Sequence, residues 1–157
     1  MPRINIHATG LVLGKTGLIL RGPSGAGKSL LALELIDEWG AEGRLVSDDR
    51  IDIEAGKTGL VMHAPKAIEG LIELRGRGIV TRPFVREAPL HLVVDLVETL
   101  ERMVEEEALS VELFGVRLAR CPVPRAGIVD PLHQLLLIRE ALRALPPRPQ
   151  ATRQKTP

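Results

Sequence analysis

The sequence is poor in aromatic residues, which make up 2% of its 157 residues and include no tyrosine. Proteins that hold nucleic-acid bases by stacking need aromatic side chains as platforms, so this mode of binding is not expected. The net charge is +1, which leaves no strong electrostatic attraction to DNA or to an anionic membrane. The composition therefore predicts neither a nucleic-acid nor a membrane partner.

Cysteine is nearly absent as well, and Cys121 is the single one in the sequence. An intramolecular disulfide and a thiolate metal cluster are therefore not expected. No uncharged apolar stretch approaches the roughly 18 residues that a membrane-spanning helix needs. The N-terminus also lacks a basic segment followed by a long apolar run, which argues against a secretory signal. These absences predict a cytoplasmic protein.

The most informative segment that is present matches the phosphate-binding loop GxxxxGK[ST]. It consists of Gly22, Pro23, Ser24, Gly25, Ala26, Gly27, Lys28 and Ser29. The glycines let the backbone turn tightly and present successive N–H groups to an anion. Lys28 is expected to reach the β- and γ-phosphates of a nucleotide, and the Ser29 hydroxyl is expected to ligate Mg²⁺. The motif therefore predicts binding of a nucleotide or of another phosphate ligand.

The residues around this loop support its assignment. Residues 17–21 are apolar and predict a short strand, and residues 29–39 are rich in helix formers, with Gly40 as a stop signal. A strand, a glycine-rich loop and a helix thus follow one another in the order that the mechanism needs. The helix directs the positive end of its dipole at the same phosphates.

The remainder of the chain predicts an α/β fold with a strand-rich, mixed sheet in a single P-loop-containing domain of residues 1–145. Further strands are expected at residues 4–8, 11–13, 44–47, 51–53, 60–62, 91–97 and 114–119. Residues 65–74 suggest a short helix or an irregular turn, Pro122 to Pro124 suggest a turn, and Pro131 opens a helix that reaches about Leu145. The proline-rich, polar tail of residues 146–157 is expected to be disordered.

A pair of carboxylates, Asp48 and Asp49, follows the short strand at residues 44–47. An acidic residue at a strand end beside a phosphate loop is a typical Mg²⁺ ligand. One carboxylate would hold the metal, and the other would accept a proton from an attacking hydroxyl. Adjacent residues on a regular strand point to opposite faces. The two carboxylates can therefore act at one site only if the strand has ended or twisted there. The alternative is a solvated Asp-Asp-Arg turn in front of a hairpin.

Three further positions carry weaker signals. Glu73 lies in the segment Glu73-Leu74-Arg75-Gly76-Arg77-Gly78 and is a candidate second metal carboxylate, whereas the whole segment also fits a charged surface turn. His7 lies on the first expected strand, where most histidines are merely packed or exposed. Arg125 follows a proline-flanked turn and is a candidate for a further phosphate contact.

The chain resembles the HPr kinase/phosphorylase family in four features and in their order along the sequence. These features are His7, the loop Gly22 to Ser29, the pair Asp48-Asp49 and the segment Glu-x-Arg-Gly-x-Gly-Ile that begins at Glu73. The resemblance is to the C-terminal catalytic domain of that family, in a short form that lacks the N-terminal domain. That family transfers a phosphoryl group from ATP to a serine of the phosphocarrier protein HPr, and it reverses the modification with inorganic phosphate.

The resemblance implies a role for each matching residue. Asp49 would transfer the proton with Asp48 as its support, and His7 would sit beside the phosphates. Ser29, Glu73 and Asp48 would hold Mg²⁺, while the loop and Arg125 would bind ATP. HPr would be the partner, and the chain would assemble as a hexamer. Two alternatives stay open: a small-molecule P-loop kinase of the same fold, and a non-catalytic, ATP-responsive regulatory module.

Overall fold

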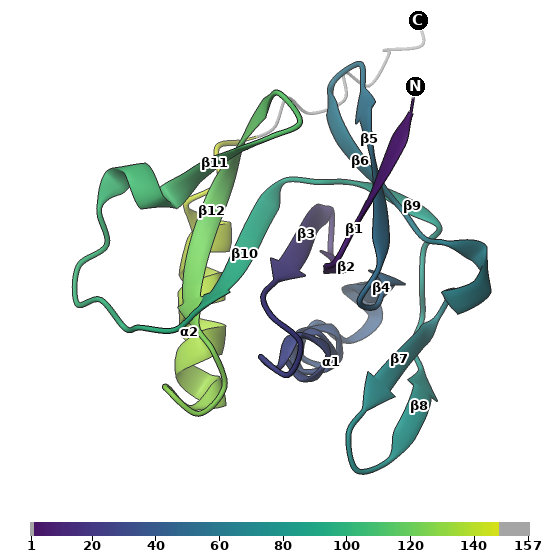
Figure 1. Cartoon of the computed structure of the whole chain (residues 1–157), viewed down its shortest axis with the longest axis horizontal. Helices are drawn as coiled ribbons and strands as arrows, with labels where there is room; N and C mark the ends of the chain where they lie inside the picture. Colours follow the sequence, from purple (N-terminus) through teal and green to yellow (C-terminus); the bar gives the residue numbers. More distant parts are fainter. Residues whose placement is uncertain (1, 148–157) are drawn as a thin grey trace, which may run out of the picture.

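The computed structural model describes residues 2–147 of the chain (Figure 1). Its strands are β1 Arg3–Ile6, β2 Thr9–Leu13, β3 Thr16–Arg21, β4 Gly43–Ser47, β5 Ile51–Gly56, β6 Gly59–His63, β7 Leu71–Leu74, β8 Gly78–Thr81, β9 Glu87–Pro89, β10 Leu92–Val97, β11 Ser110–Leu113 and β12 Val116–Pro124. Its helices are α1 Lys28–Glu38 and α2 Pro131–Arg143, with short 3₁₀ turns at Gly40–Glu42, Lys66–Ile68 and Glu106–Leu109. The predicted disorder concerns residues 146–157, of which 148–157 lie outside the described residues.

The largest sheet has the strand order β11-β12-β10-β3-β2-β4. β10 runs parallel to both β3 and β12, whereas β2 is antiparallel to β3 and β4, and β11 is antiparallel to β12. Central β3 contributes Leu18, Ile19 and Leu20, which are all fully buried, as expected for a strand covered on both faces. The predicted α/β class with a strand-rich, mixed sheet is therefore confirmed.

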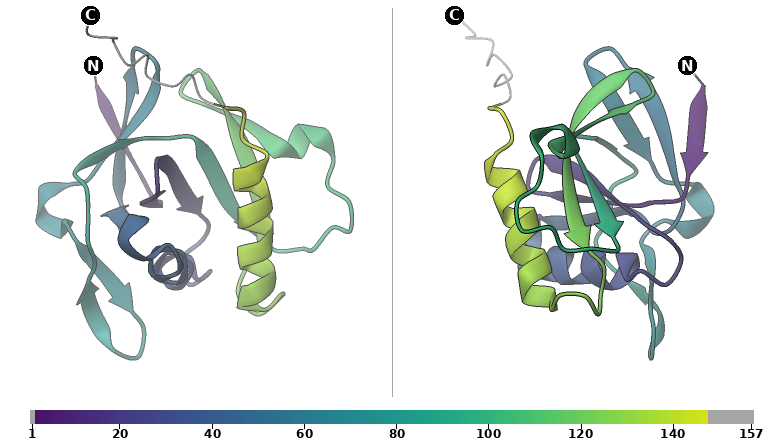
Figure 2. Two further views of the ribbon diagram at one scale, coloured as in Figure 1. Left: turned by 180° about the vertical axis from the view of Figure 1, so that it is seen from behind. Right: turned by 60° about the vertical axis from the view of Figure 1, so that its left-hand side comes forward.

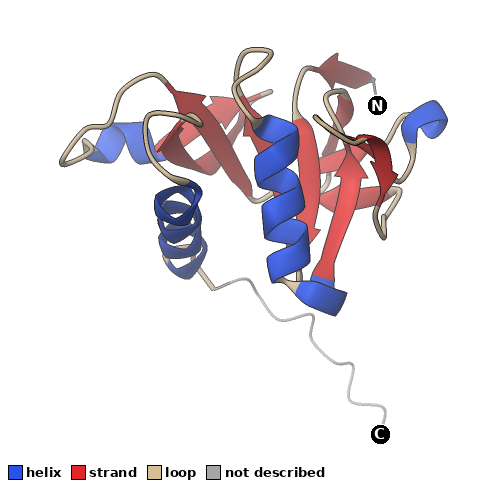
Figure 3. Ribbon diagram, turned by 90° about the horizontal axis from the view of Figure 1, so that it is seen from below, coloured by secondary structure: helices blue, strands red, loops and turns tan. Residues whose placement is uncertain are grey.

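Each face of this sheet is covered by a different layer. Helices α1 and α2 pack on one face and form a core that includes Leu20, Leu35 and Ile138. Figure 3 shows both helices on the same side of the strands. The other face, with Ile19, packs against the antiparallel sheet β1-β5-β6-β9, which contributes residues such as Met62. In Figure 2 (right) β1, β5 and β6 lie on the far side of the molecule from α2.

Four strands of the large sheet end at one edge of the molecule. β3, β10 and β12 run parallel, and β4 runs in the same direction as β3 because β2 is antiparallel to both. The phosphate loop follows β3, and Asp48 follows β4, so the topology brings these segments to the same edge. The β7–β8 hairpin forms a separate two-stranded sheet that projects beside this edge (Figure 1).

Most of the predicted elements are present close to their expected positions. The strands expected at residues 11–13 and 17–21 form the antiparallel hairpin β2–β3, and those expected at 51–53 and 60–62 form the antiparallel hairpin β5–β6. Helix α1 spans Lys28–Glu38 against a predicted range of 29–39, and α2 ends at Arg143 rather than at Leu145. Over residues 2–147, the structure has no helix that is both long and apolar enough to cross a membrane.

The predicted turn at Pro122 to Pro124 is wrong, because these residues continue β12. β12 pairs with β11 only as far as Ala119, so its last part has β10 on one side and an open edge on the other. The Arg125 N–H donates to Val97 O at 2.9 Å, and alternate backbone N–H groups of a strand point to the same side. The nitrogens of Pro122 and Pro124 therefore face the open edge, where a missing N–H breaks no hydrogen bond.

Two smaller expectations also need correction. The segment 65–74 contains the expected short turn, but it ends in strand β7, Leu71–Leu74. β7 has only four residues, Leu-Ile-Glu-Leu, which is too short for a clear strand pattern, and glycines follow it directly at Gly76 and Gly78. His7 was predicted on the first strand, whereas β1 ends at Ile6 and His7 occupies the bend before β2.

Candidate active site

The phosphate loop connects the end of β3 to the first turn of α1. Gly25 and Gly27 have φ angles of 82° and 94°, in the left-handed region where residues with a Cβ are strained. Gly27 is the N-cap of α1, and no side chain caps the first backbone N–H groups of this helix. Free N–H groups at the positive end of the dipole form a cradle for an anion, as the motif predicts.

Lys28 is held against the same loop. Its side chain is largely buried, with a residue exposure of 8%. The Nζ donates hydrogen bonds to the carbonyl oxygens of Gly22 at 2.7 Å and Pro23 at 3.2 Å. The ammonium therefore lies beside the N–H cradle with its charge directed along the loop, where it can meet the phosphate of a ligand.

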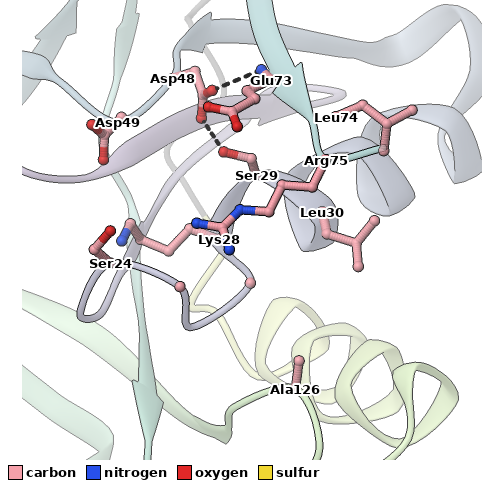
Figure 4. Close-up of a pocket in the computed structure, with 12 residues that line it drawn as sticks. Ser24, Lys28, Ser29, Leu30, Asp48, Asp49, Glu73, Leu74, Arg75 and Ala126 are labelled. Carbon is pink, nitrogen blue, oxygen red and sulfur yellow. Dashed lines mark hydrogen bonds between the residues drawn. The ribbon is translucent and has the colours of Figure 1, made fainter. Parts of the chain in front are cut away.

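Asp48 and Asp49 both border this loop. The strand before them has already ended, which the two carboxylates need in order to act at one site. β4 stops at Ser47, and Asp49 has a φ angle of 65° in the left-handed region. The Ser29 Oγ donates to Asp48 Oδ1 at 2.7 Å, as Figure 4 shows. The carboxylate after β4 and the hydroxyl at the start of α1 are therefore in direct contact.

The β7–β8 hairpin closes another side of the site. The backbone N–H of Glu73 donates to Asp48 Oδ2 at 3.1 Å, so Asp48 links the hairpin to the phosphate loop. Figure 4 shows the side chain of Arg75 extending from the hairpin toward that loop. Arg75 lines the cavity with Glu73, whereas Arg77 does not. The hairpin thus supplies a carboxylate and a guanidinium to a site whose other residues come from the large sheet.

Together these segments enclose a cavity of about 340 Å³. It is lined by Ser24, Gly25, Gly27, Lys28, Ser29, Leu30, Asp48, Asp49, Glu73, Leu74, Arg75 and Ala126. The cations and backbone N–H groups suit a polyphosphate, and the carboxylates suit a divalent metal or the proton of a hydroxyl. The cavity therefore has groups that can bind a phosphate chain and, beside them, a carboxylate that can accept a proton.

The donor set fits Mg²⁺ better than a metal that is held by protein ligands alone. Among residues 2–147, no group of three or more histidine, cysteine or acidic side chains is placed to hold a metal ion. The oxygen donors of Ser29 and Asp48 are adjacent, and Glu73 lies in the same cavity. Mg²⁺ typically takes one or two carboxylates and completes its octahedron with phosphate oxygens and water.

Not all predicted residues line the cavity. His7 is exposed in its bend and is outside the lining, although its neighbour Ala8 donates its N–H to Asp49 O at 3.2 Å. The guanidinium of Arg125 forms an ion pair with Glu98 at 2.8 Å, and Ala126 lines the cavity in its place. Gly22 and Pro23 take part through their carbonyls, and Ala26 is buried below the loop.

Sequence reasoning missed Thr9, which is fully buried at the start of β2 and hydrogen-bonds to Asp48. A single threonine at the beginning of a strand carries no motif. Its contact with Asp48 spans 39 positions in the sequence and arises only because β2 lies beside β4. Leu30 and Ala126 were also missed, since small or apolar residues beside a motif carry no chemical signal.

Behind the loop, an ion cluster fixes the end of β3. Asp95 on β10 accepts hydrogen bonds from Arg21 at 2.7 and 2.9 Å and from Arg120 at 2.6 Å. Burial alone would raise the pKa of Asp95, but the hydrogen bonds and charges of the two arginines outweigh burial and hold the pKa below its ordinary value. The hydrogen bond to Asp95 correspondingly raises the pKa of Arg21. Arg21 directly precedes Gly22, so this cluster anchors the start of the loop.

The single cysteine plays no part in this chemistry. Cys121 is buried on β12, and burial raises the pKa of its thiol to about 12. A thiol with this pKa carries almost no thiolate at neutral pH, and thiolate is the reactive form. Cys121 is a packing residue of the core under α2, where its Sγ lies 3.5 Å from the carbonyl oxygen of Leu137.

Comparisons with known proteins agree with this geometry. Residues 1–129 match the family model of the HPr Serine kinase C-terminal domain. HPr kinase/phosphorylase of Clostridium acetobutylicum is 30% identical over 91% of this chain and 48% of its own length. HPr kinase/phosphorylase of Caldanaerobacter subterraneus subsp. tengcongensis is 35% identical over 88% of this chain and 47% of its own length. This chain thus spans about half the length of the curated relatives that it matches.

A solved structure extends the similarity to three dimensions. The Hpr(Ser) kinase/phosphatase from Coxiella burnetii superposes with a TM-score of 0.73 at 28% sequence identity, over 89% of this chain and 88% of that chain. The resemblance inferred from His7, the loop, the aspartate pair and the Glu73 segment is confirmed at the level of the family. The chain belongs to the family of the HPr serine kinase C-terminal domain.

Proposed function

We propose that this chain is an ATP- and Mg²⁺-dependent protein-serine kinase whose acceptor is HPr. The observation that carries the proposal is the direct hydrogen bond between Ser29 of the phosphate loop and Asp48, with Asp49 beside it in the same cavity. In a chain of this family, that arrangement sets a metal ligand and a basic group next to the site of a nucleotide's phosphates.

On the donor side, Lys28 and the N–H groups of the loop bind the phosphates of ATP, and Arg75 adds a further positive charge. Ser29, Asp48 and Glu73 would hold Mg²⁺. When bound, Mg²⁺ neutralises charge on the phosphate oxygens and helps to orient the terminal phosphoryl group. Because the chain is so poor in aromatic residues, we expect the phosphates to contribute more to affinity than the base does.

On the acceptor side, Asp49 takes the proton of the attacking serine hydroxyl. The serine oxygen forms a bond to the γ-phosphorus, the bond from this phosphorus to the β–γ bridging oxygen breaks, and ADP leaves. In the reverse direction an oxygen of inorganic phosphate forms a bond to the phosphorus of phosphoserine, and the bond from this phosphorus to the serine oxygen breaks. Protonated Asp49 gives its proton to the serine oxygen, and pyrophosphate leaves. Asp48 keeps Asp49 in place from its contacts with Ser29 and Glu73.

The contacts of His7 and Arg125 with the phosphates remain predictions from the sequence, because neither residue lines the cavity. His7 is exposed in its bend, and the next residue, Ala8, donates its N–H to Asp49 O, which supports a place for His7 near the site. Arg125 would contact phosphate only after it leaves Glu98. Assembly as a hexamer rests on the family resemblance, and sedimentation of the purified protein tests it. A cytoplasmic location remains the prediction made from the sequence.

The most direct test is incubation with ATP, Mg²⁺ and purified HPr, followed by intact-mass spectrometry of HPr. The proposal predicts the addition of one phosphoryl group to a serine. No added mass on HPr, with ATP still bound, would favour the ATP-responsive regulatory module. ATP turnover with HPr unmodified, and faster in the presence of a small hydroxyl compound, would favour the small-molecule kinase. A module that only senses ATP needs no base, which is why Asp49 favours the kinase.

A further inference from the structure

Thr9 is a buried polar residue that touches the site without lining it. It is the first residue of β2, its exposure is 0%, and it is absent from the cavity lining. β2 lies between the strand of the phosphate loop and the strand of the aspartate pair, with Gly10 opposite Ser47. Thr9 is therefore placed next to the point where β4 ends.

The hydroxyl of Thr9 contacts both aspartates at once. Its Oγ1 donates to Asp48 Oδ1 at 3.0 Å and accepts the backbone N–H of Asp49 at 3.1 Å. A threonine hydroxyl has one proton to donate and lone pairs that accept, so both functions are used. Asp48 Oδ1 also receives the Ser29 hydroxyl, so one carboxylate oxygen joins the start of β2 to the phosphate loop.

The backbone that Thr9 holds is in an unfavourable conformation. Asp49 has a φ of 65°, and a residue with a side chain pays about 1–2 kcal/mol for the left-handed region, somewhat less for aspartate. Such a conformation persists only where the surroundings fix it. Here the Asp49 N–H is held by Thr9 and the Asp49 carbonyl by the N–H of Ala8. The left-handed residue lets Asp49 line the same cavity as Asp48.

We propose that Thr9 is a positioning residue that fixes the relative orientation of Asp48 and Asp49. The inference rests on the proposed function, in which Asp49 accepts the proton and Asp48 supports it. Thr9 itself touches neither phosphate nor acceptor, because it lies outside the cavity. Its hydroxyl acts through one carboxylate and one backbone N–H, so its loss changes the geometry of transfer and leaves the N–H cradle for ATP intact.

Two substitutions separate the hydroxyl from the shape of the side chain. Thr9→Val keeps the volume and the β-branch but removes the hydroxyl, which leaves the Asp49 N–H without the acceptor that it has in the wild type. Thr9→Ser keeps the hydroxyl and loses a methyl group. Thr58→Val makes the same chemical change at an exposed turn position and serves as the control for the substitution itself.

The decisive experiment combines steady-state transfer to HPr with hydrogen–deuterium exchange at the Asp49 amide. For Thr9→Val we expect kcat to fall by about 100-fold, as for a catalytic group that is misplaced, while KM for ATP changes by less than about twofold. We also expect the Asp49 amide to exchange about tenfold faster. Thr9→Ser should restore both values to within about threefold of the wild type, and Thr58→Val should match the wild type.

Either of two results overturns the inference. One is an unchanged rate of Asp49 amide exchange in Thr9→Val. The other is a loss of transfer that Thr9→Ser does not restore, or that appears equally in kcat and in ATP affinity, because a general loss of structure has that effect. Amide exchange does not depend on the acceptor. If the wild type fails to modify HPr, the proposed function is contradicted, and the exchange measurement still decides whether Thr9 holds Asp49.

Discussion

The strand ends that carry the phosphate loop and the aspartate pair are cross-linked through buried polar side chains, whereas the β7–β8 hairpin that carries Glu73 and Arg75 is mostly exposed. On the sheet side, Thr9, Lys28 and Ser47 are buried polar residues with hydrogen-bond partners. In the hairpin Ile72 is buried, while Ile79 is 64% exposed. The strand ends of the large sheet form one side of the cavity, called the fixed side here, and the hairpin forms the other. The fixed side is anchored by many more buried contacts than the hairpin.

The difference in anchoring suggests that the strand ends and the hairpin have different roles in the proposed reaction. Phosphoryl transfer needs a fixed geometry between the donor phosphates and the base, and the cross-linked strand ends provide it. Contact with a protein acceptor needs exposed surface, which the hairpin provides. The hairpin is joined to the rest of the molecule by the buried side chain of Ile72, by the hydrogen bond from Glu73 to Asp48 and, just after β8, by the ion pair of Arg82 with Asp37. Substitutions on the two sides should therefore differ in their effects on transfer and on stability.

The largest effect is expected for Asp49→Asn on the fixed side. Asparagine keeps the shape and the tolerance for the left-handed conformation, but it cannot accept the serine proton. We expect kcat for transfer to HPr to fall by about 10²- to 10⁴-fold, the usual contribution of a general base. Titration calorimetry should show nearly unchanged ATP affinity. Transfer at the wild-type rate would show that Asp49 is not the base.

Lys28→Ala should act on nucleotide binding itself. The ammonium lies at the loop and is replaced by a methyl group, so a charge-assisted contact with phosphate is lost. We expect Kd for ATP to rise by about 10- to 100-fold, which corresponds to the strength of one hydrogen bond to a charged group. Lys57→Ala, at an exposed turn, is the matched control and should bind like the wild type. Equal affinity of the Lys28 variant would contradict the assignment of the loop.

The two ion pairs that anchor the two sides should differ in their contribution to stability. Asp95→Asn breaks the cluster of Arg21 and Arg120, and we expect a loss of about 2 kcal/mol in unfolding free energy near neutral pH. Asp37→Asn breaks the exposed pair with Arg82 and should cost less than about 1 kcal/mol. Urea unfolding measures both, and a larger effect at Asp37 would reverse the comparison.

The effect at Asp95 should also depend on pH. Its pKa in the folded protein lies below the ordinary value of 3.8, so its stabilisation is present above that value. The stabilisation is lost as the pH falls through the folded pKa, where the carboxylate takes up its proton. The difference in stability between the wild type and Asp95→Asn should therefore shrink in strong acid. A difference that grows with acidity would mean that the arginines do not hold the carboxylate in its charged form.

The smallest effect is expected for Arg75→Ala on the hairpin. Arg75 lines the cavity from an exposed position, where solvent and salt screen its charge. We expect transfer efficiency to fall by about two- to fivefold at low salt, and by less at high salt. Arg77→Ala removes the same charge two residues away in the same turn and outside the lining, so it should have no effect. An equal effect of both variants would indicate general electrostatics rather than a contact of Arg75.

Much of the fixed side could be predicted from the sequence because its signals are local. The loop, its glycines and Lys28 lie within one motif, and the strand and helix around it follow from short apolar patterns. The aspartate pair was found because it follows a strand at the expected distance from the loop. Thr9 was not found, because its role depends on the pairing of β2 with β4. The prolines at the end of β12 led to the wrong prediction of a turn for the same reason. Only the order of the strands shows that this part of β12 has an open edge, where proline is tolerated.

The central claim is that the phosphoryl group lost by ATP at this loop arrives on a serine of HPr. A single-turnover reaction with enzyme in excess over ATP, in the presence of Mg²⁺ and HPr, tests it most directly. Consumed ATP and phosphoserine on HPr are counted in the same quenched samples by mass spectrometry. The account predicts one phosphoserine for each ATP consumed, with the same time course. Consumption of ATP while HPr stays unmodified would contradict it.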